Sequence, residues 1–185
     1  MTDFQTVVVG AGVVGLATAA RLARHGPLLL LERHDDICRE TSSRSSEVVH
    51  AGIYYPPDSL KARSCVRGKA LLYERCDRLG IAAPRIGKLI VATDADEEGR
   101  LTALTERSAA NGVPLEPLGS TALRRRHPGV PGVAALWSAT TGIVDSHAYA
   151  ASFEAEAMAH GADLIFQSEV VGAGFDGVHR LRVRH

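Results

Sequence analysis

The chain has 185 residues, and its 21 Lys and Arg balance 21 Asp and Glu, so the formal net charge is zero. A neutral chain lacks the basic surface that attracts nucleic acids or anionic membranes, so we expect no nucleic-acid partner. Hydrophobic residues make up 45% and charged residues 23%, which is typical of folded globular proteins and excludes a disordered chain.

Three cysteines, Cys38, Cys65 and Cys76, form no CxxC pair. This spacing argues against a disulfide scaffold or a metal site and favours a reducing compartment. The uncharged stretch 4–20 contains three glycines and follows no Lys or Arg, unlike a signal peptide or a membrane span. We therefore expect a cytoplasmic protein without either segment.

The first elements predict a βαβ unit. A β-branched strand, Thr6–Val9, runs into the motif GAGVVG at Gly10–Gly15. A small-residue helix covers about 13–24. The next strand, Leu28–Leu31, is a continuous apolar run, as in parallel strands covered on both faces, and it ends at Glu32.

The next part of the chain is polar and then helical. A polar loop around Thr41–Ser46 (TSSRSS) and a Gly- and Pro-containing bend, His50–Pro57, lead to a long amphipathic helix over Leu60–Leu79. Ser59 is the expected N-cap of this helix, and Gly80 ends it.

The remaining elements alternate between strands and helices. Asp94 and Glu97 form a predicted capping box, and Asp145 is a predicted N-cap. These elements are a strand over Lys88–Thr93, a helix to about Ala110, a helix over Thr121–Arg126, a strand over Ala134–Ser138, a helix over about Ser146–His160, a strand over Leu164–Val171 and, after a turn at Asp176–Gly177, a strand over Val178–Arg184.

The glycine motif predicts a nucleotide site because of its context. Gly10 permits the tight turn, Gly12 lets the backbone approach a pyrophosphate, and Gly15 lets the helix pack on the strand. Glu32 lies 22 residues beyond Gly10, where a carboxylate accepts hydrogen bonds from a ribose and favours FAD or NAD over NADP. The alternative is a glycine turn in an ordinary βαβ unit.

The segment after Glu32 favours FAD over NAD. An NAD domain continues with another strand, whereas this chain continues with the hydroxyls and the guanidinium of TSSRSS. Such groups can bind a diphosphate and the ribityl oxygens, and the small residues of the bend at 50–52 allow backbone to approach a flat ring. As a bare pattern, the cluster can also be a solvated loop.

Three stretches carry a family resemblance. They read ETSSRSSEVVHAGIYYPPDSLKARSCVRGKALLYERC, GKLIVAT and TTGIVDSHAYA. This pattern resembles the L-2-hydroxyglutarate dehydrogenase/oxidase family, within the larger D-amino-acid-oxidase-like group of FAD enzymes. The resemblance implies an α/β, Rossmann-like FAD-binding fold with part of a second, mixed-sheet substrate domain. The implied division is residues 1–80 for the FAD-binding βαβ unit with the flavin-contacting loop and helix, 81–145 for the partial substrate domain, and 146–185 for a return to the FAD-binding domain.

The resemblance also implies the residues that bind FAD. The ADP half would be held by the glycine motif and the residues after the second strand, and the flavin half by the two segments that follow. The implied residues are Gly10, Gly12, Val13, Val14, Gly15, Glu32 and Arg33 for the ADP half, Ser42, Ser43, Arg44 and Ser46 for the diphosphate and ribityl chain, His50, Ala51 and Gly52 near the isoalloxazine, and Val170 near the adenine.

The implied reaction is oxidation of a 2-hydroxy acid, L-2-hydroxyglutarate, to 2-oxoglutarate by hydride transfer to flavin N5. His50 is the candidate base, because imidazole exchanges protons near neutral pH; a structural histidine is the equal alternative. Tyr54, Tyr55 and Lys61 are candidate substrate residues, and ordinary packing or helix surface is the alternative for each. Other functions left open are an amino-acid or glycine oxidase, a glycerol-3-phosphate dehydrogenase, and a non-catalytic nucleotide-binding half of a split enzyme.

The resemblance covers only the N-terminal half of the family pattern. We therefore expect a truncated or split product with a poor flavin site and little activity alone. The parallel sheet is expected to stop at its first strand, with an apolar edge unpaired. The missing half as a separate chain is a candidate partner. The electron acceptor is left open between oxygen and a quinone, with a peripheral inner-membrane location for the second case.

Overall fold

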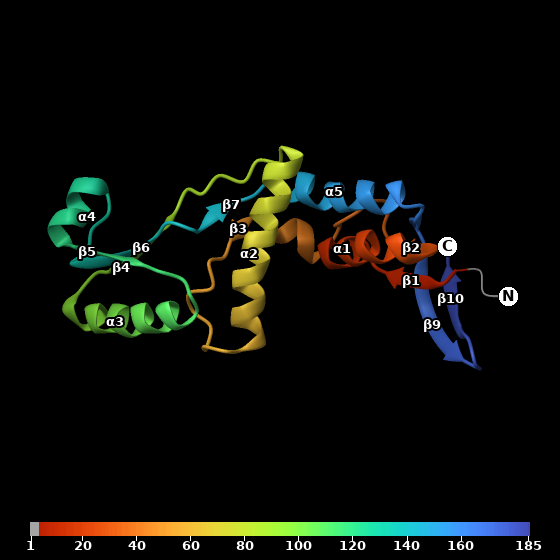
Figure 1. The fold of residues 1–185 in the computed structure, drawn as a ribbon, viewed down its shortest axis with the longest axis horizontal. Helices are drawn as coiled ribbons and strands as arrows, with labels where there is room; N and C mark the ends of the chain where they lie inside the picture. The colour runs from red at the N-terminus through yellow and green to blue at the C-terminus, as the bar shows by residue number, and fades with distance from the viewer. Residues whose placement is uncertain (1–3) are drawn as a thin grey trace. The chain divides into compact units, whose positions relative to one another are not determined.

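In the computed structural model, which describes residues 4–185, the chain divides into two compact units. Unit 1 consists of the segment that ends at Ser46 together with Asp145–His185, and unit 2 is Glu47–Val144. The chain therefore passes from unit 1 to unit 2 directly after the TSSRSS loop, and it returns to unit 1 at Asp145, the N-cap of a later helix. Both units combine helices and strands (Figure 1).

Unit 1 contains a parallel sheet in the order β1-β2-β8. Its strands are β1 (Thr6–Val9), β2 (Leu28–Leu31) and β8 (Asp163–Ile165). The helices α1 (Val13–Leu22), which continues as a 3-10 turn (Ala23–His25), and α5 (Ser146–Ala159) lie side by side (Figure 1). Small side chains let these helices approach closely, and the core between helices and sheet contains Ala11, Leu16, Ala19, Leu28, Leu30, Ala150 and Ala157.

The edge of this sheet agrees with the prediction from the sequence. Among residues 4–185, β2 is the only strand that pairs with β1. Val7 is 39% exposed and Val9 is 58% exposed, although both lie in an apolar strand. The expected apolar edge is therefore confirmed.

The predicted strand over Leu164–Val171 is wrong, because the structure has two strands there. β8 ends at Ile165, and β9 (Glu169–Phe175) pairs with β10 (His179–Arg184) in an antiparallel hairpin. Gln167 has a φ of 53°, so the chain turns between the two strands. The turn at Asp176–Gly177 is confirmed.

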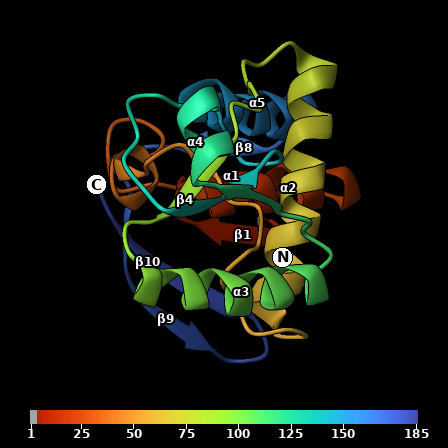
Figure 2. The same ribbon diagram turned by 90° about the vertical axis from the view of Figure 1, so that its left-hand side faces the viewer.

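Unit 2 contains an antiparallel sheet in the order β4-β6-β5. The strands are β4 (Lys88–Ala92), β5 (Glu116–Gly119) and β6 (Ala134–Ser138), and the helices α3 (Ala95–Ala110) and α4 (Ser120–Arg126) lie on opposite sides of the sheet (Figure 2). The sequence did not predict β5, which contains Pro117. Proline is tolerated there because β5 is an edge strand.

The long helix of unit 2 forms as predicted. α2 (Leu60–Leu79) begins at Ser59, whose hydroxyl accepts a hydrogen bond from Ala62 N at 3.1 Å, and ends at Gly80 with a φ of +69°. No helix within residues 4–185 combines the length and the apolar character needed to cross a bilayer. The short antiparallel pair β3 (Val48–Val49) and β7 (Gly142–Ile143) was not predicted, since two residues show no periodicity.

The helix caps are largely as expected. Asp145 accepts a hydrogen bond from Ala148 N at 2.9 Å, and Asp94 accepts one from Glu97 N at 2.9 Å. The reciprocal bond of the predicted capping box is different, because the Glu97 carboxylate accepts from Thr93 N at 2.8 Å instead of Asp94 N.

The two units differ in extent from the domains predicted from the sequence. Residues 47–80, which the prediction groups with the FAD-binding βαβ unit, belong to unit 2 by their contacts. The predicted domains were defined by which segments contact the flavin and which the substrate. That functional division stays a prediction.

Candidate nucleotide-binding site

Two glycines shape the turn between β1 and α1, and the backbone geometry of the turn requires both of them. Gly10 has a φ of +97°, which side-chain-bearing residues rarely adopt, and its N–H donates to Leu31 O at 2.8 Å. A Cβ atom on Gly15 would lie 1.9 Å from Gly10 O. Both glycines therefore hold the start of α1 against the ends of β1 and β2.

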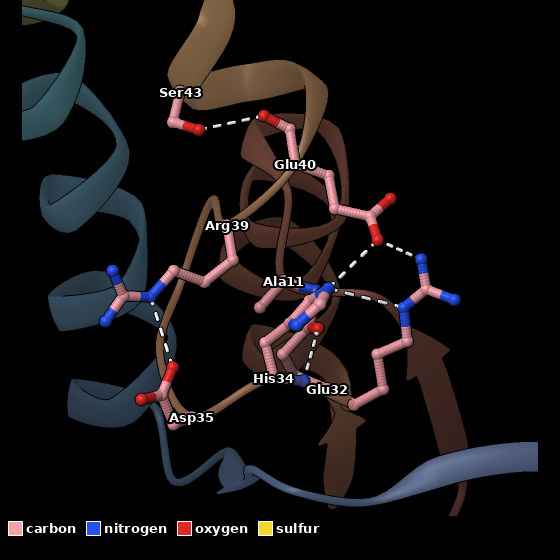
Figure 3. A network of polar contacts seen from close by, with 8 residues as sticks. Ala11, Glu32, His34, Asp35, Arg39, Glu40 and Ser43 are labelled. Carbon is pink, nitrogen blue, oxygen red and sulfur yellow. Dashed lines mark hydrogen bonds and ion pairs between the residues drawn. The ribbon is translucent and has the colours of Figure 1, made fainter.

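Glu32 connects the end of β2 to this turn. Its carboxylate accepts hydrogen bonds from Ala11 N at 2.6 Å and from His34 N at 2.9 Å (Figure 3). Only 7% of Glu32 is exposed, and a buried carboxylate needs such partners. Because a carboxylate offers about four lone-pair sites, Glu32 can still accept from the hydroxyls of a ribose.

Ser42 lies at the N-terminus of α1. The 3-10 turn Thr41–Arg44 brings it there, and its hydroxyl accepts a hydrogen bond from Val13 N at 3.1 Å. A Cβ atom on Gly12 would lie 3.2 Å from the same hydroxyl oxygen. Three groups thus meet at one point, namely the positive end of the α1 dipole, the backbone of Gly12 and the Ser42 hydroxyl. This combination suits a phosphate group.

A cavity of about 420 Å³ opens beside these groups within unit 1. It brings together six of the predicted cofactor residues from four segments of the chain: Gly10, Gly12, Glu32, Arg33, Ser42 and Val170. Thr41, which belongs to the predicted TSSRSS cluster, also lines the cavity. The other lining residues were not predicted as cofactor residues, and they are Val9, Leu31, His34, Cys38, Arg39, Glu40, Ser168 and Glu169. The strand ends could have indicated Ser168 and Glu169, since ligands bind beyond the carboxyl ends of parallel strands.

The remaining predicted residues of unit 1 do not line this cavity. Val13 and Val14 line a separate apolar depression together with Tyr149 and Phe153 of α5. The side chains of Ser43, Arg44 and Ser46 are exposed, and the Ser43 hydroxyl donates to Glu40 O at 2.8 Å.

Charged side chains form the outer wall of the cavity. Arg33 pairs with Glu40, and His34 Nε2 lies 2.9 Å from the same Glu40 carboxylate. Next to them, Arg39 Nε lies 3.2 Å from the carboxylate of Asp35 (Figure 3). These exposed pairs balance the charge along the wall and contribute little to stability.

The predicted flavin and substrate residues belong to unit 2. His50 is exposed, whereas Ala51 and Gly52 are buried and Gly52 has a φ of +102°. Lys61 Nζ lies 4.8 Å from the centre of the Tyr55 ring. A second ammonium, Lys88 Nζ, lies 4.7 Å from the centre of the Tyr54 ring. Each tyrosine is thus paired with a lysine, at a distance typical of cation–π contacts.

Sequence comparison decides the family. The model of the family "FAD dependent oxidoreductase" (DAO) matches residues 5–185. The chain belongs to this family. The cofactor predicted from the sequence, FAD, is therefore confirmed, and so is the family resemblance.

Named relatives of this FAD dependent oxidoreductase are L-2-hydroxyglutarate dehydrogenases. The mitochondrial protein of Homo sapiens is 41% identical over 175 residues, which cover 92% of this chain and 38% of the human protein. The mitochondrial protein of Arabidopsis thaliana is 48% identical over 146 residues, which cover 78% of this chain and 30% of that protein. The chain thus spans well under half the length of these relatives.

A solved structure shows the same fold. The L-alpha-glycerophosphate oxidase of Mycoplasma pneumoniae, solved with FAD bound, superposes with a TM-score of 0.91 and 26% identity. The superposition covers 99% of this chain and 50% of that protein. The predicted D-amino-acid-oxidase-like fold is confirmed.

The residues of the cavity fit the ADP half of FAD. Glu32 offers acceptors for ribose hydroxyls, and the α1 N-terminus with Gly12 and Ser42 offers a phosphate site; Val170 lies in the wall of the same cavity. These are the groups that dinucleotide recognition requires, and the cavity has the volume of a ligand site.

Cys38 gives a chemical test of this cavity. Burial raises the pKa of its thiol above the ordinary value, and the carboxylates of Asp36, Glu154 and Glu32 add to the rise. Since the thiolate is the reactive form, we expect slow alkylation by iodoacetamide at pH 7 and a rate that increases as the pH rises. Saturating ADP is expected to slow the reaction, because Cys38 lines the cavity.

The matched control for this experiment is Cys65 in unit 2. Burial also raises the pKa of the Cys65 thiol, so its alkylation should show a similar dependence on pH. ADP should leave the Cys65 rate unchanged, and mass spectrometry of the two tryptic peptides separates the rates. Equal effects of ADP on both thiols, or none on Cys38, would contradict the placement of ADP in this cavity.

Proposed function

We propose that this chain supplies the ADP-binding site and the flavin-facing segment of an enzyme that oxidises L-2-hydroxyglutarate to 2-oxoglutarate. The observation that carries the cofactor part is the buried Glu32 carboxylate, bonded to Ala11 N in a cavity that also contains Gly12 and Ser42. The substrate part is supported by the relatives, which are named L-2-hydroxyglutarate dehydrogenase and are 41% and 48% identical to the chain.

Within this proposal, Glu32 binds the ribose and the α1 N-terminus binds the diphosphate. Ser43, Arg44 and Ser46 are proposed to contact the diphosphate and the ribityl chain, and FAD when bound supplies the two-electron acceptor for the oxidation. Arg33, which lines the cavity, remains part of the proposed ADP site. Val13 and Val14, which line the separate depression, also remain part of it.

The chemistry proposed for unit 2 is proton transfer and carboxylate binding. His50 is exposed and carries an imidazole, so it can take the proton of the substrate hydroxyl as the carbonyl forms. Lys61, which lies over the Tyr55 ring, can neutralise a substrate carboxylate, and Tyr54 can donate a hydrogen bond to it. Ala51 and Gly52, which are buried, are proposed to lie near the isoalloxazine beside the exposed His50.

The proposal includes a separate chain as a partner. The exposed edge of β1 supports pairing with a further strand, supplied by a separate chain. The proposed location is cytoplasmic, and the electron acceptor is either oxygen or a quinone at the inner membrane surface.

The test is single-turnover reduction of flavin bound to the chain. The chain is loaded with FAD, freed of excess FAD and mixed anaerobically with L-2-hydroxyglutarate, its D-enantiomer, glycine or glycerol 3-phosphate. We expect bleaching of the flavin spectrum by L-2-hydroxyglutarate alone, at a lower rate than in a full-length relative. Bleaching by glycine or glycerol 3-phosphate would favour the alternative flavoenzymes, and flavin that stays bound but is bleached by none of the four compounds would overturn the proposal.

A further inference from the structure

The segment from His50 to Tyr55 has no regular secondary structure, and its backbone is held by side chains from other elements. The strongest of these contacts come from Asn111, at the C-terminal end of α3. Its Nδ2 lies 3.0 Å from Gly52 O and 2.9 Å from Tyr55 O. Both partners are carbonyl oxygens, so only the NH2 group of the amide can face them, and both of its hydrogens are used.

Asn111 itself is well placed to act as an anchor. Its backbone N–H closes the last turn of α3 on Arg107 O at 3.2 Å and Ser108 O at 3.1 Å. The amide therefore projects from the end of a regular helix, and a helix is a more rigid support than a loop.

Packing around Gly52 leaves this backbone little freedom. Ala51 and Ile53 are 3% and 2% exposed and pack with Val113, two residues beyond Asn111. A Cβ atom on Gly52 would lie 2.8 Å from Val66 Cγ2. Gly52 is a buried residue, and leaving the carbonyl of a buried residue without its hydrogen bond is costly.

Two further side chains contact the same segment, but over longer distances. Cys65 Sγ lies 3.4 Å from His50 O, and a thiol is a weak donor. Lys69 Nζ lies 3.4 Å from Ala51 O and 3.1 Å from Thr140 Oγ1. Asn111 is therefore the main polar constraint on the segment.

We infer that Asn111 is a positioning residue for the flavin-facing segment. By fixing Gly52 O and Tyr55 O, it sets the backbone path of the segment and therefore the direction in which the exposed His50 is presented. This role rests on the proposed function, in which that segment contacts flavin and substrate.

The test compares Asn111→Asp with Ser108→Ala in the full 185-residue chain. The aspartate has the same size, but it has no donors and turns its charge toward two carbonyl oxygens. Ser108 is also buried in the last turn of α3, but its hydroxyl donates to Thr105 O, at 3.1 Å, a bond within the helix itself, so its loss spares the segment. Asn111→Gly, which removes the side chain without adding charge, serves if the aspartate variant does not fold.

Two readouts are measured. In Asn111→Asp, hydrogen exchange of the amides of residues 50–55 is expected to accelerate about tenfold. The affinity for FAD is expected to fall about tenfold, while the affinity for ADP is unchanged. Ser108→Ala should change neither readout. A general loss of stability cannot separate FAD from ADP, because both share the site in unit 1.

The outcomes are distinguishable. Unchanged exchange at residues 50–55 in the Asn111 variants, or an equal loss of ADP and FAD affinity, overturns the role of Asn111. If the unaltered chain binds ADP and FAD equally well, the proposed flavin contact itself fails, while the exchange data still report whether Asn111 holds the segment.

Discussion

Replacing Glu32 with alanine is expected to lower the affinity of the chain for ADP and FAD by about 100-fold and the free energy of unfolding by about 3 kcal/mol. The carboxylate is 7% exposed and accepts from Ala11 N at 2.6 Å and His34 N at 2.9 Å. Alanine leaves both N–H groups without their acceptor. The ribose also loses its proposed acceptor.

The matched control for Glu32→Ala is Glu40→Ala. Glu40 lies on the wall of the same cavity and carries the same charge, but 53% of its side chain is exposed and its partners are the exposed Arg33 and His34. We expect Glu40→Ala to lower the free energy of unfolding by less than about 1 kcal/mol and to change the affinity for ADP and FAD only slightly.

Glu32→Gln separates charge from hydrogen bonding. Its amide oxygen can accept from one of the two N–H groups, while its NH2 group faces the other, so an intermediate effect is expected. The measurements are urea unfolding and titration with ADP followed by calorimetry. Equal losses of affinity in Glu32→Ala and Glu40→Ala would show that Glu32 does not contact the ribose.

The local part of the fold could be predicted because it depends on neighbouring residues. The turn at Gly10, the caps at Ser59 and Asp145 and the end of α2 at Gly80 follow from backbone preferences that each residue carries in any protein. The parallel order of β1 and β2 follows from the βαβ pattern, since such crossovers are right-handed and short.

Other parts of the fold depend on contacts between distant segments and had no local signal. The two-residue strand Val48–Val49 exists only because residues 142–143 pair with it. β5 contains Pro117, and a proline argues against a strand until its edge position is known. The break at Gln167 requires a positive φ in a residue other than glycine, which sequence alone rarely indicates.

The candidate site shows the same difference between residues that the sequence indicates and contacts that it does not. Gly12, Glu32 and Val170 were predicted, and the structure brings them to one cavity. The bond from Val13 N to Ser42 joins residues 29 positions apart, and the contacts of Asn111 span 56 and 59 positions. Such contacts are set by the folded chain, so a sequence pattern can indicate the residue types but not the pairs.

Gly15→Ala is expected to destabilise the chain by about 3 kcal/mol and to abolish ADP binding, whereas Gly12→Ala is expected to weaken binding with little loss of stability. On Gly15, the added Cβ would lie 1.9 Å from Gly10 O, a backbone atom that can move only with β1 or α1. That movement would also disturb the bond from Ala11 N to Glu32. On Gly12, the nearest atom is Ser42 Oγ at 3.2 Å, which a rotation of the serine can relieve.

Gly68→Ala calibrates these effects. Gly68 lies on the exposed face of α2, no atom of a neighbouring group lies within 4 Å of the place that an added Cβ would take, and an alanine there should raise stability by about 1 kcal/mol. Urea unfolding should therefore rank Gly68→Ala above the unaltered chain, Gly12→Ala close to it and Gly15→Ala far below it. ADP titration should rank Gly68→Ala equal to the unaltered chain and Gly12→Ala about tenfold weaker, because its methyl group enters the cavity beside the α1 N-terminus. If Gly12→Ala bound ADP as tightly as Gly68→Ala, the phosphates could not lie against the backbone of Gly12, and the helix N-terminus would lose its role as the anchor of the cofactor.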